Sequence, residues 1–309
     1  MLSSTFVLAG DRLTYAKLAA VTMIWGGTFV AGRFLAADLD PLLTASLRFI
    51  LASLALLLFM AFARIPLACP TPAQMARLVL LGFFGIFFYN LCFFYGLHFI
   101  NASRASLIVA LNPAVIGLAS CWWFKERLGR RQVLGIALCL GGAACVIVSR
   151  NPLLLQGRAD AWIGDLLIFG CVVSWGVYSL GARTLNHSLG PLQTVTWSVL
   201  LGTLMLCLAT LVTGRLTVQA LDAIHWPHLL GLLYLGVLGS ALAYIGYYDG
   251  IRRIGATRAG VFIALNPLTA VVCGALLLDE QLSTAMYFGG ALILLGIYLG
   301  NKPLAPARA

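Results

Sequence analysis

Arg48 is a charged residue inside an apolar stretch of the chain. It lies about seven residues into the apolar run 41–63. A charge inside a membrane span is costly and normally faces a cavity or a partner group. One role for such a guanidinium is to hold a substrate carboxylate. The alternative is structural, either snorkelling to the membrane surface or bonding to a carbonyl of a neighbouring helix.

Asp249 is the second candidate, because it ends the apolar run 228–250. A carboxylate in a membrane span could carry a coupling proton. However, Arg252 and Arg253 follow at positions i+3 and i+4, a helical spacing that favours ion pairs. We therefore favour a salt bridge for Asp249 and keep proton coupling as the alternative.

Aromatic and amide residues gather in several of the apolar runs and could line a pocket. A cavity of this composition suits amphipathic or aromatic ligands. The alternative is an aromatic belt at the membrane surface, which we expect for Tyr247 and Tyr248 near the end of their run. Together with Arg48, the residues predicted to bind substrate are Trp25, Asn90, Trp175, Tyr178 and Tyr244.

Pro113 and Pro267 each follow an asparagine inside an apolar run. A proline within a helix leaves one backbone carbonyl without its donor and bends the helix. We expect bends at both prolines. The bends could let parts of the protein rock, or they could be fixed kinks that shape the helix bundle.

The composition places these residues in a membrane protein. Charged residues make up 10% of the 309 residues and hydrophobic residues 61%, whereas a soluble domain carries about 25% charged residues. The net charge of +10 comes from Lys and Arg in the connectors between apolar runs, which is typical of membrane orientation signals rather than of nucleic-acid binding. The cysteines form no CxxC pair, which argues against a disulfide framework or a zinc site. We expect no metal and no cofactor.

Ten apolar runs are long enough to cross a bilayer, which predicts an all-α membrane protein with ten transmembrane helices. Ten spans put both termini on one side of the membrane. Most basic residues of the connectors then fall on that side, so both termini are predicted to be cytoplasmic. The runs are 17–36, 41–63, 77–98, 104–124, 132–149, 162–182, 191–213, 228–250, 258–278 and 284–301.

The chain also repeats itself. Trp25-Gly26 recurs as Trp175-Gly176 at a shift of 150 residues. Farther along the shift is 154, so that Ala110-Leu111-Asn112-Pro113 recurs as Ala264-Leu265-Asn266-Pro267. A difference of four residues in the connector after the second span of each half explains the change.

Each predicted half holds five spans, so the second half must enter the membrane upside down relative to the first. We place the halves at 1–150 and 161–301. The basic loop 125–131 has as its counterpart Asp279-Glu280-Gln281-Leu282-Ser283, which contains no basic residue. Two inverted five-helix repeats are typical of secondary transporters, in which a small-molecule substrate binds between the halves near the bilayer midplane.

The end helices of both predicted halves carry small residues. Gly135, Gly141 and Gly142 lie in the fifth run, and Gly289-Gly290 and Gly296 lie in the tenth. Small residues let helices approach closely. We expect packing within the chain, and the same faces could also support a homodimer.

The chain resembles the EamA type of the drug/metabolite transporter superfamily along nearly its whole length. The resemblance is carried by Trp25-Gly26, Arg48-Phe49, Gly255-Ala256-Thr257-Arg258-Ala259-Gly260, Leu265-Asn266-Pro267 and Leu278-Asp279-Glu280, with Asp279 in place of the usual glycine. It implies a ten-helix, inverted-repeat carrier of the bacterial inner membrane. Members commonly export amino acids, related metabolites or drugs by alternating access. Proton coupling would be compatible with this role.

Other functions are weighed against export of amino acids or related metabolites. A cationic drug exporter would need a deep carboxylate, and Asp249 is the candidate for one. An importer of the same fold is a further alternative. A membrane-embedded enzyme is the rival from another class, but the sequence contains no GxSxG motif and no complete GxGD motif. We therefore predict a carrier and not an enzyme.

Overall fold

The computed structural model describes residues 2–100, 102–125, 128–150, 160–269 and 283–301. The described residues form helices and connecting turns, with no strand among them. The elements are α1 Leu2–Asp38, α2 Pro41–Phe62, α3 Pro72–Gly82, the π-helix η1 Phe83–Phe88, α4 Tyr89–Phe99, α5 Ala102–Val109, α6 Asn112–Phe124, α7 Arg130–Arg150, α8 Ala161–Ser188, α9 Pro191–Val212, α10 Val218–Asp222, α11 Trp226–Leu233, the π-helix η2 Tyr234–Leu242, α12 Ala243–Ile254, α13 Ala256–Val261, the 3-10 helix η3 Phe262–Ala264 and α15 Thr284–Asn301.

Nine helical segments of the described residues are long and apolar enough to cross a membrane. They confirm the predicted all-α membrane fold. The predicted span 258–278 begins with α13 and η3, and its end, which includes Cys273, lies outside the described residues. The motif Leu278-Asp279-Glu280 also lies outside the described residues. Because residues 151–159 are also not described, the boundaries 1–150 and 161–301 stay predictions.

Several helices are longer than the apolar runs that predicted them. The third span runs from Pro72 to Phe99, although the apolar run begins at 77. A capping box explains the earlier start, because Thr71 and Gln74 satisfy each other's backbone N–H groups and Pro72 fits the first helical turn. By contrast, α2 begins at Pro41 as predicted, and the Asp40 side chain caps it by accepting hydrogen bonds from the backbone N–H groups of Leu42 and Leu43.

The two halves pack against each other through equivalent contacts. A Cβ added to Gly82 would lie 2.9 Å from the carbonyl oxygen of Ser198. A Cβ added to its counterpart Gly236 would lie 2.6 Å from the carbonyl oxygen of Arg48, the counterpart of Ser198. The third span of each half therefore packs on the second span of the other half, and only a glycine permits either approach.

Two residues even contact their own repeat counterparts. The ring centroids of Trp25 and Trp175 are 5.1 Å apart, and the hydroxyl oxygens of Ser53 and Thr203 are 2.9 Å apart. Each of these pairs is separated by 150 residues in the sequence. Two symmetry-related residues can touch only near the symmetry axis, so the axis between the inverted halves passes through these contacts.

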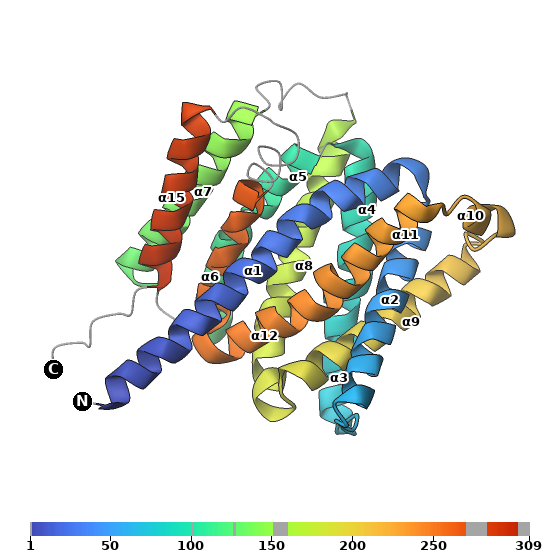
Figure 1. Ribbon diagram of the computed structural model, residues 1–309, viewed down its shortest axis with the longest axis horizontal. Helices are drawn as coiled ribbons and strands as arrows, with labels where there is room; N and C mark the ends of the chain where they lie inside the picture. Colours follow the sequence, from blue (N-terminus) through green and yellow to red (C-terminus); the bar gives the residue numbers. More distant parts are fainter. Residues whose placement is uncertain (1, 101, 126–127, 151–159, 270–282, 302–309) are drawn as a thin grey trace.

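The end helices α7 and α15 pack together at one edge of the helix bundle, as Figure 1 shows. Their glycines pair across the interface, because added Cβ atoms on Gly142 and Gly296 would lie 2.5 and 2.6 Å from the carbonyl oxygens of Gly289 and Gly135. The small-residue faces are therefore used within the chain. The start of α1 and the end of α15 lie toward the same end of the helices (Figure 1).

Candidate functional site

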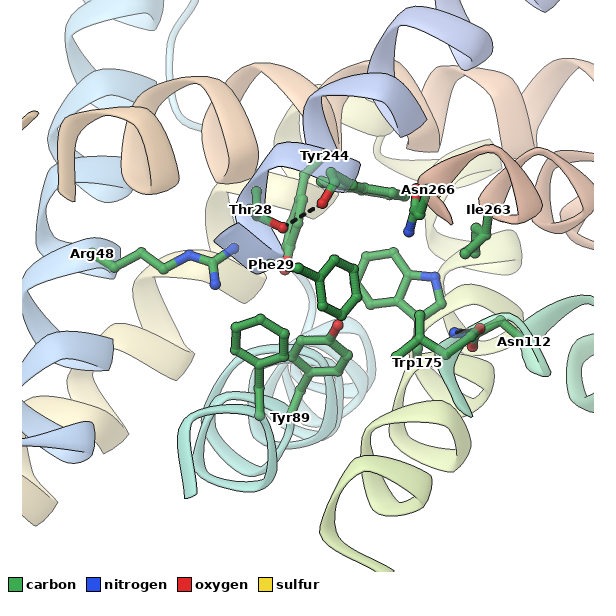
Figure 2. A pocket seen from close by; sticks show the side chains of 12 residues that line it. Thr28, Phe29, Arg48, Tyr89, Asn112, Trp175, Tyr244, Ile263 and Asn266 are labelled. Carbon is green, nitrogen blue, oxygen red and sulfur yellow. Dashed lines mark hydrogen bonds between the residues drawn. The ribbon is translucent and has the colours of Figure 1, made fainter. Parts of the chain in front are cut away.

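A small pocket lies between the two halves, and Figure 2 shows the side chains around it. Three pairs of repeat counterparts contribute to the lining, Trp25 with Trp175, Val109 with Ile263, and Asn112 with Asn266. The pocket therefore lies on the symmetry axis. The complete lining is Trp25, Thr28, Phe29, Arg48, Tyr89, Phe93, Val109, Asn112, Trp175, Tyr244, Ile263 and Asn266.

The free volume of this pocket is about 30 Å³. That is enough for a water molecule, whereas sites for small molecules typically measure about 300–1,000 Å³. The central pocket of this structure is therefore too narrow for a metabolite. A metabolite can enter only if the lining helices move apart.

Arg48 is the cation of the pocket and is 4% exposed. Its Nε donates a hydrogen bond to Ser240 Oγ at 3.0 Å, and its Nη1 donates to Asn90 Oδ1 at 3.2 Å. The guanidinium carbon lies 5.1 Å from the centroid of the Phe49 ring. These contacts orient the side chain from both halves, because Asn90 belongs to the first half and Ser240 to the second.

The charge of Arg48 is not neutralised by any described carboxylate within ion-pair distance. An unpaired buried charge is expensive, and proteins retain one in a membrane span mainly where it serves a ligand or a partner. Asn90 and Ser240 accept hydrogen bonds but bring no negative charge. The pocket therefore favours an anionic group beside Arg48.

The two π-helices place the hydrogen-bond partners of Arg48. Ser240 lies in η2 and donates its hydroxyl proton to the carbonyl of Leu235, five residues earlier. Asn90 is the second residue after η1, and its Nδ2 donates to the carbonyl of Ile86 at 2.7 Å. π-helical turns occur often at functional sites, and here they occupy matching places in both halves.

Aromatic rings form the other walls of the pocket (Figure 2). The Trp25 Nε1 donates to the Gly239 carbonyl at 2.9 Å, which fixes the indole. The Trp175 ring packs against Trp25 edge to face, and its centroid lies 5.4 Å from that of Tyr244. Aromatic faces of this kind can pack against an apolar or aromatic part of a ligand.

The structure brings together most, but not all, of the residues that the sequence predicts to bind substrate. Arg48, Trp25, Trp175 and Tyr244 line the pocket. Asn90 is fully buried behind the pocket and holds Arg48.

Tyr178 also lies outside the lining. It packs on Trp175 at 5.2 Å between ring centroids and shares a hydrogen bond with Ser198 at 3.0 Å.

Asp249 lies away from the pocket, near the end of α12. Its carboxylate pairs with Arg252 at 3.3 Å and with Arg253 at 2.9 Å, and its side chain is 18% exposed. Tyr247 and Tyr248 precede it. The expected aromatic belt is wrong for both tyrosines, because they are fully buried and pack on Trp175 and Tyr178. This face of α12 therefore points into the helix bundle and not toward lipid.

Pro113 and Pro267 accompany interruptions of their helices. α5 ends at Val109, and α6 begins at Asn112, so Pro113 occupies its first turn. In the second half, α13 gives way to η3 shortly before Pro267. The contribution of these two prolines to transport stays a prediction.

Asn112 and Asn266 were noted from the sequence only as the residues before Pro113 and Pro267, but both also line the pocket. They are 2% and 4% exposed, and neither Oδ1 has a hydrogen-bond partner among the described residues. Buried amide oxygens are normally satisfied. The sequence did carry a signal, because an asparagine that recurs at the same place in both halves must lie symmetrically about any central site.

Comparisons with known proteins agree with this architecture. The profile of the EamA-like transporter family matches residues 13–148 and 162–301. A crystal structure with 20% sequence identity has the same fold, with a TM-score of 0.75 over 95% of this chain and 99% of the other.

Two curated relatives cover most of the chain. The "Uncharacterized transporter YetK" of Bacillus subtilis (strain 168) is 25% identical over 289 residues, which are 92% of this chain and 86% of the relative. The "Probable amino-acid metabolite efflux pump" of Escherichia coli (strain K12) is 28% identical over 287 residues, which are 90% and 91%. Because the family profile matches both halves, which together make up most of the sequence, the chain belongs to the EamA-like transporter family, part of the drug/metabolite transporter superfamily.

Proposed function

We propose that this chain exports amino acids or related small metabolites across the bacterial inner membrane by alternating access. The observation that carries the proposal is Arg48, a buried guanidinium without a described carboxylate partner, in a pocket between inverted halves. A guanidinium binds a carboxylate through two parallel hydrogen bonds. The substrate carboxylate would supply the negative charge that the pocket lacks.

The remaining lining suits the rest of an amino acid. The rings of Trp25, Trp175 and Tyr244 offer apolar surface for a side chain. The amides of Asn112 and Asn266 can accept hydrogen bonds from an ammonium group. The printed name of the Escherichia coli relative, an amino-acid metabolite efflux pump, favours the same substrate class.

The narrow pocket suits an intermediate of alternating access. Arg104 forms one closure, because it pairs with Asp165 through hydrogen bonds of 2.7 and 2.5 Å. This ion pair joins the fourth span to the sixth and therefore joins the two halves. Tyr247 and Tyr248 form a second closure, because both rings are fully buried and pack on Trp175 and Tyr178. Substrate would pass when one of these two closures opens.

A cationic drug fits this pocket less well. None of its lining residues is acidic, and Arg48 would repel a second cation. Asp249 would have to leave two ion pairs before it could carry a proton or bind a cation. Proton coupling through Asp249 therefore stays an alternative.

The test is uptake of radiolabelled amino acids into everted inner-membrane vesicles, with and without an uncoupler. We expect uptake of at least one apolar or aromatic amino acid. We expect it to fall at least tenfold in Arg48→Gln, because a charged hydrogen bond worth about 1.5–3 kcal/mol is lost. Ser198→Ala, at the repeat counterpart of Arg48, is the matched control. Absence of uptake by correctly inserted wild-type protein would remove the proposal of export.

A further inference from the structure

Two equivalent contacts join the halves at opposite ends of the helix bundle. Near the start of α3, Gln74 Nε2 donates to Ser188 Oγ at 3.4 Å. At the far end of α1, His228 Nε2 lies 3.1 Å from Asp38 Oδ2 (Figure 1 shows these two ends). Gln74 corresponds to His228 at the shift of 154 residues, and Ser188 corresponds to Asp38 at the shift of 150. The same contact between a first span and a third span is therefore made twice, once without and once with ionisable groups.

The hydrogen bonds of His228 match those of Gln74. Gln74 Oε1 accepts from the backbone N–H of Thr71 at 2.9 Å. His228 Nδ1 accepts in the same way from the backbone N–H of His225 at 3.1 Å. Each side chain thus uses an acceptor atom within its own helix and a donor atom toward the other half. An amide keeps one acceptor and one donor at any pH, whereas an imidazole does so only while it is neutral. The contact with Asp38 therefore holds a neutral imidazole with its proton on Nε2.

Protonation of His228 would disrupt this arrangement. A proton on Nδ1 would stand against the backbone N–H of His225, so that two donors would face each other. The new positive charge would also lie in the first turn of α11, where the helix dipole disfavours a cation. The imidazole of His225, whose centroid lies 5.9 Å away, could add a second charge. Asp38 would attract the cation, but its side chain is 54% exposed, so water screens this attraction.

The other ionisable groups near this end have partners of their own. α11 packs against α1, α2 and η2. Asp40, which precedes α2, pairs with Arg215 at 3.3 Å. Arg33 of α1 donates to a backbone carbonyl of α4. The hydroxyl of Tyr234 in η2 donates to a backbone carbonyl of α1 at 2.7 Å. We therefore expect a pH response at this end to come from His228 rather than from these groups.

We propose that His228 is a proton-binding site that controls the opening of this end of the carrier. Histidine is the side chain that normally changes its charge between pH 5 and 8. When the imidazole takes up a proton from water at Nδ1, it can no longer accept from the N–H of His225. Acid should therefore loosen the start of α11 and its contact with the end of α1. The equivalent contact of Gln74 with Ser188 contains no ionisable group and should not respond.

The test is hydrogen–deuterium exchange of the full-length protein in nanodiscs at about pH 8 and about pH 5, the range in which histidine titrates. Labelling times are scaled for the effect of pH on the intrinsic exchange rate. We expect the scaled exchange of the backbone amides of α11 to rise roughly threefold at the lower pH, as the loss of one neutral hydrogen bond predicts. The amides of α3 are the internal control, because Gln74 makes the equivalent contact there.

Variants separate His228 from other causes of a pH response. His228→Gln keeps one acceptor and one donor, so it should fold and exchange alike at both pH values. The double variant Asp38→Ser with His228→Gln copies the uncharged pair of the other end and should behave in the same way. His98→Gln is the matched control, because it removes an exposed histidine of α4 and should keep the response.

Three results would overturn the proposal. They are a pH response that persists in His228→Gln, an equal response of α3, and an exchange of α11 in the wild type that stays constant or falls at the lower pH. The site lies outside the lining of the central pocket, and the exchange is measured without substrate. Failure of this test would therefore leave the proposed export of amino acids untouched.

Discussion

The surroundings of Arg48 in the first half and of Ser198 in the second have the same backbone but different chemistry. Both residues approach a glycine of the other half, Gly236 and Gly82 respectively. Arg48 bonds to Asn90 and Ser240 and faces the pocket. Ser198 bonds to Tyr178, outside the pocket lining. The glycine contacts that recur in both halves therefore hold the helices together. The polar site lies where the two halves differ, at Arg48.

The largest effect should come from breaking the shared scaffold. Gly236→Leu and Gly82→Leu each force a side chain against the backbone of the other half, because even a Cβ would lie within 3 Å of a carbonyl oxygen. Overpacking of this kind costs about 1–3 kcal/mol or more. We expect both variants to lose most folded protein, as measured by fluorescence-detected size-exclusion chromatography.

Gly141→Leu is the matched control for these two variants. Gly141 is exposed on α7, and an added Cβ there would meet nothing within 4 Å. It should elute like the wild type. If Gly236→Leu and Gly82→Leu also did so, the packing across the halves would be wrong.

A smaller effect should follow when Arg48 keeps its charge but loses a partner. Asn90→Ala removes the acceptor for Arg48 Nη1, whose hydrogen bond measures 3.2 Å. A hydrogen bond to a charged group contributes about 1.5–3 kcal/mol. We expect the KM for the transported amino acid to rise about tenfold, measured in everted vesicles, while the protein still inserts. An unchanged KM with a lowered melting temperature would give Asn90 a purely structural role.

The paired asparagines should contribute less individually than together. Asn112→Ala and Asn266→Ala each remove one amide from the lining of the central pocket. Each loss of a neutral hydrogen bond costs about 0.5–1.5 kcal/mol, so we expect a several-fold rise in KM for single variants and a larger one for the double variant. The check is to compare the KM for an amino acid with the KM for the corresponding acid that lacks the amino group. If the variants affect both alike, the amides do not bind the ammonium group.

The smallest effect is expected for Ser240→Ala. Its hydroxyl accepts from Arg48 Nε at 3.0 Å, but this variant removes a single oxygen atom, whereas Asn90→Ala removes a fully buried amide that also bonds to the carbonyl of Ile86. We expect a loss of transport of about twofold to fivefold. Ser53→Ala is a suitable control, because Ser53 also bonds across the halves, to Thr203, but does not line the central pocket.

The fold could be predicted from the sequence because lipid imposes a simple pattern. Apolar length marks each span, and the recurrence of Asn112-Pro113 as Asn266-Pro267 marks the repeat. Helix ends were less predictable. The start at Pro72 depends on capping by Thr71 and Gln74, which apolar length does not register.

The candidate site was predicted in part, because some of its residues stand out from the apolar pattern. Arg48 was conspicuous because it is a charged residue among apolar ones. Trp25 and Trp175 were conspicuous because they occupy the same position in the two repeats. Tyr247 and Tyr248 were placed wrongly at the membrane surface, because position along a span does not show which way a helix face points. Tyr178 and Asn90 proved to lie behind the lining, a distinction that depends on packing across the halves.

The recognition of a carboxylate by Arg48 can be measured directly in purified protein. The measurement compares thermal stabilisation by a transported amino acid with stabilisation by its amide, which lacks the carboxylate charge, in wild type and in Arg48→Gln. We expect the acid to stabilise the wild type far more than the amide does, and Arg48→Gln to lose this difference while Ser198→Ala keeps it. Equal stabilisation of wild type by acid and amide, or an undiminished preference in Arg48→Gln, would contradict carboxylate recognition by Arg48.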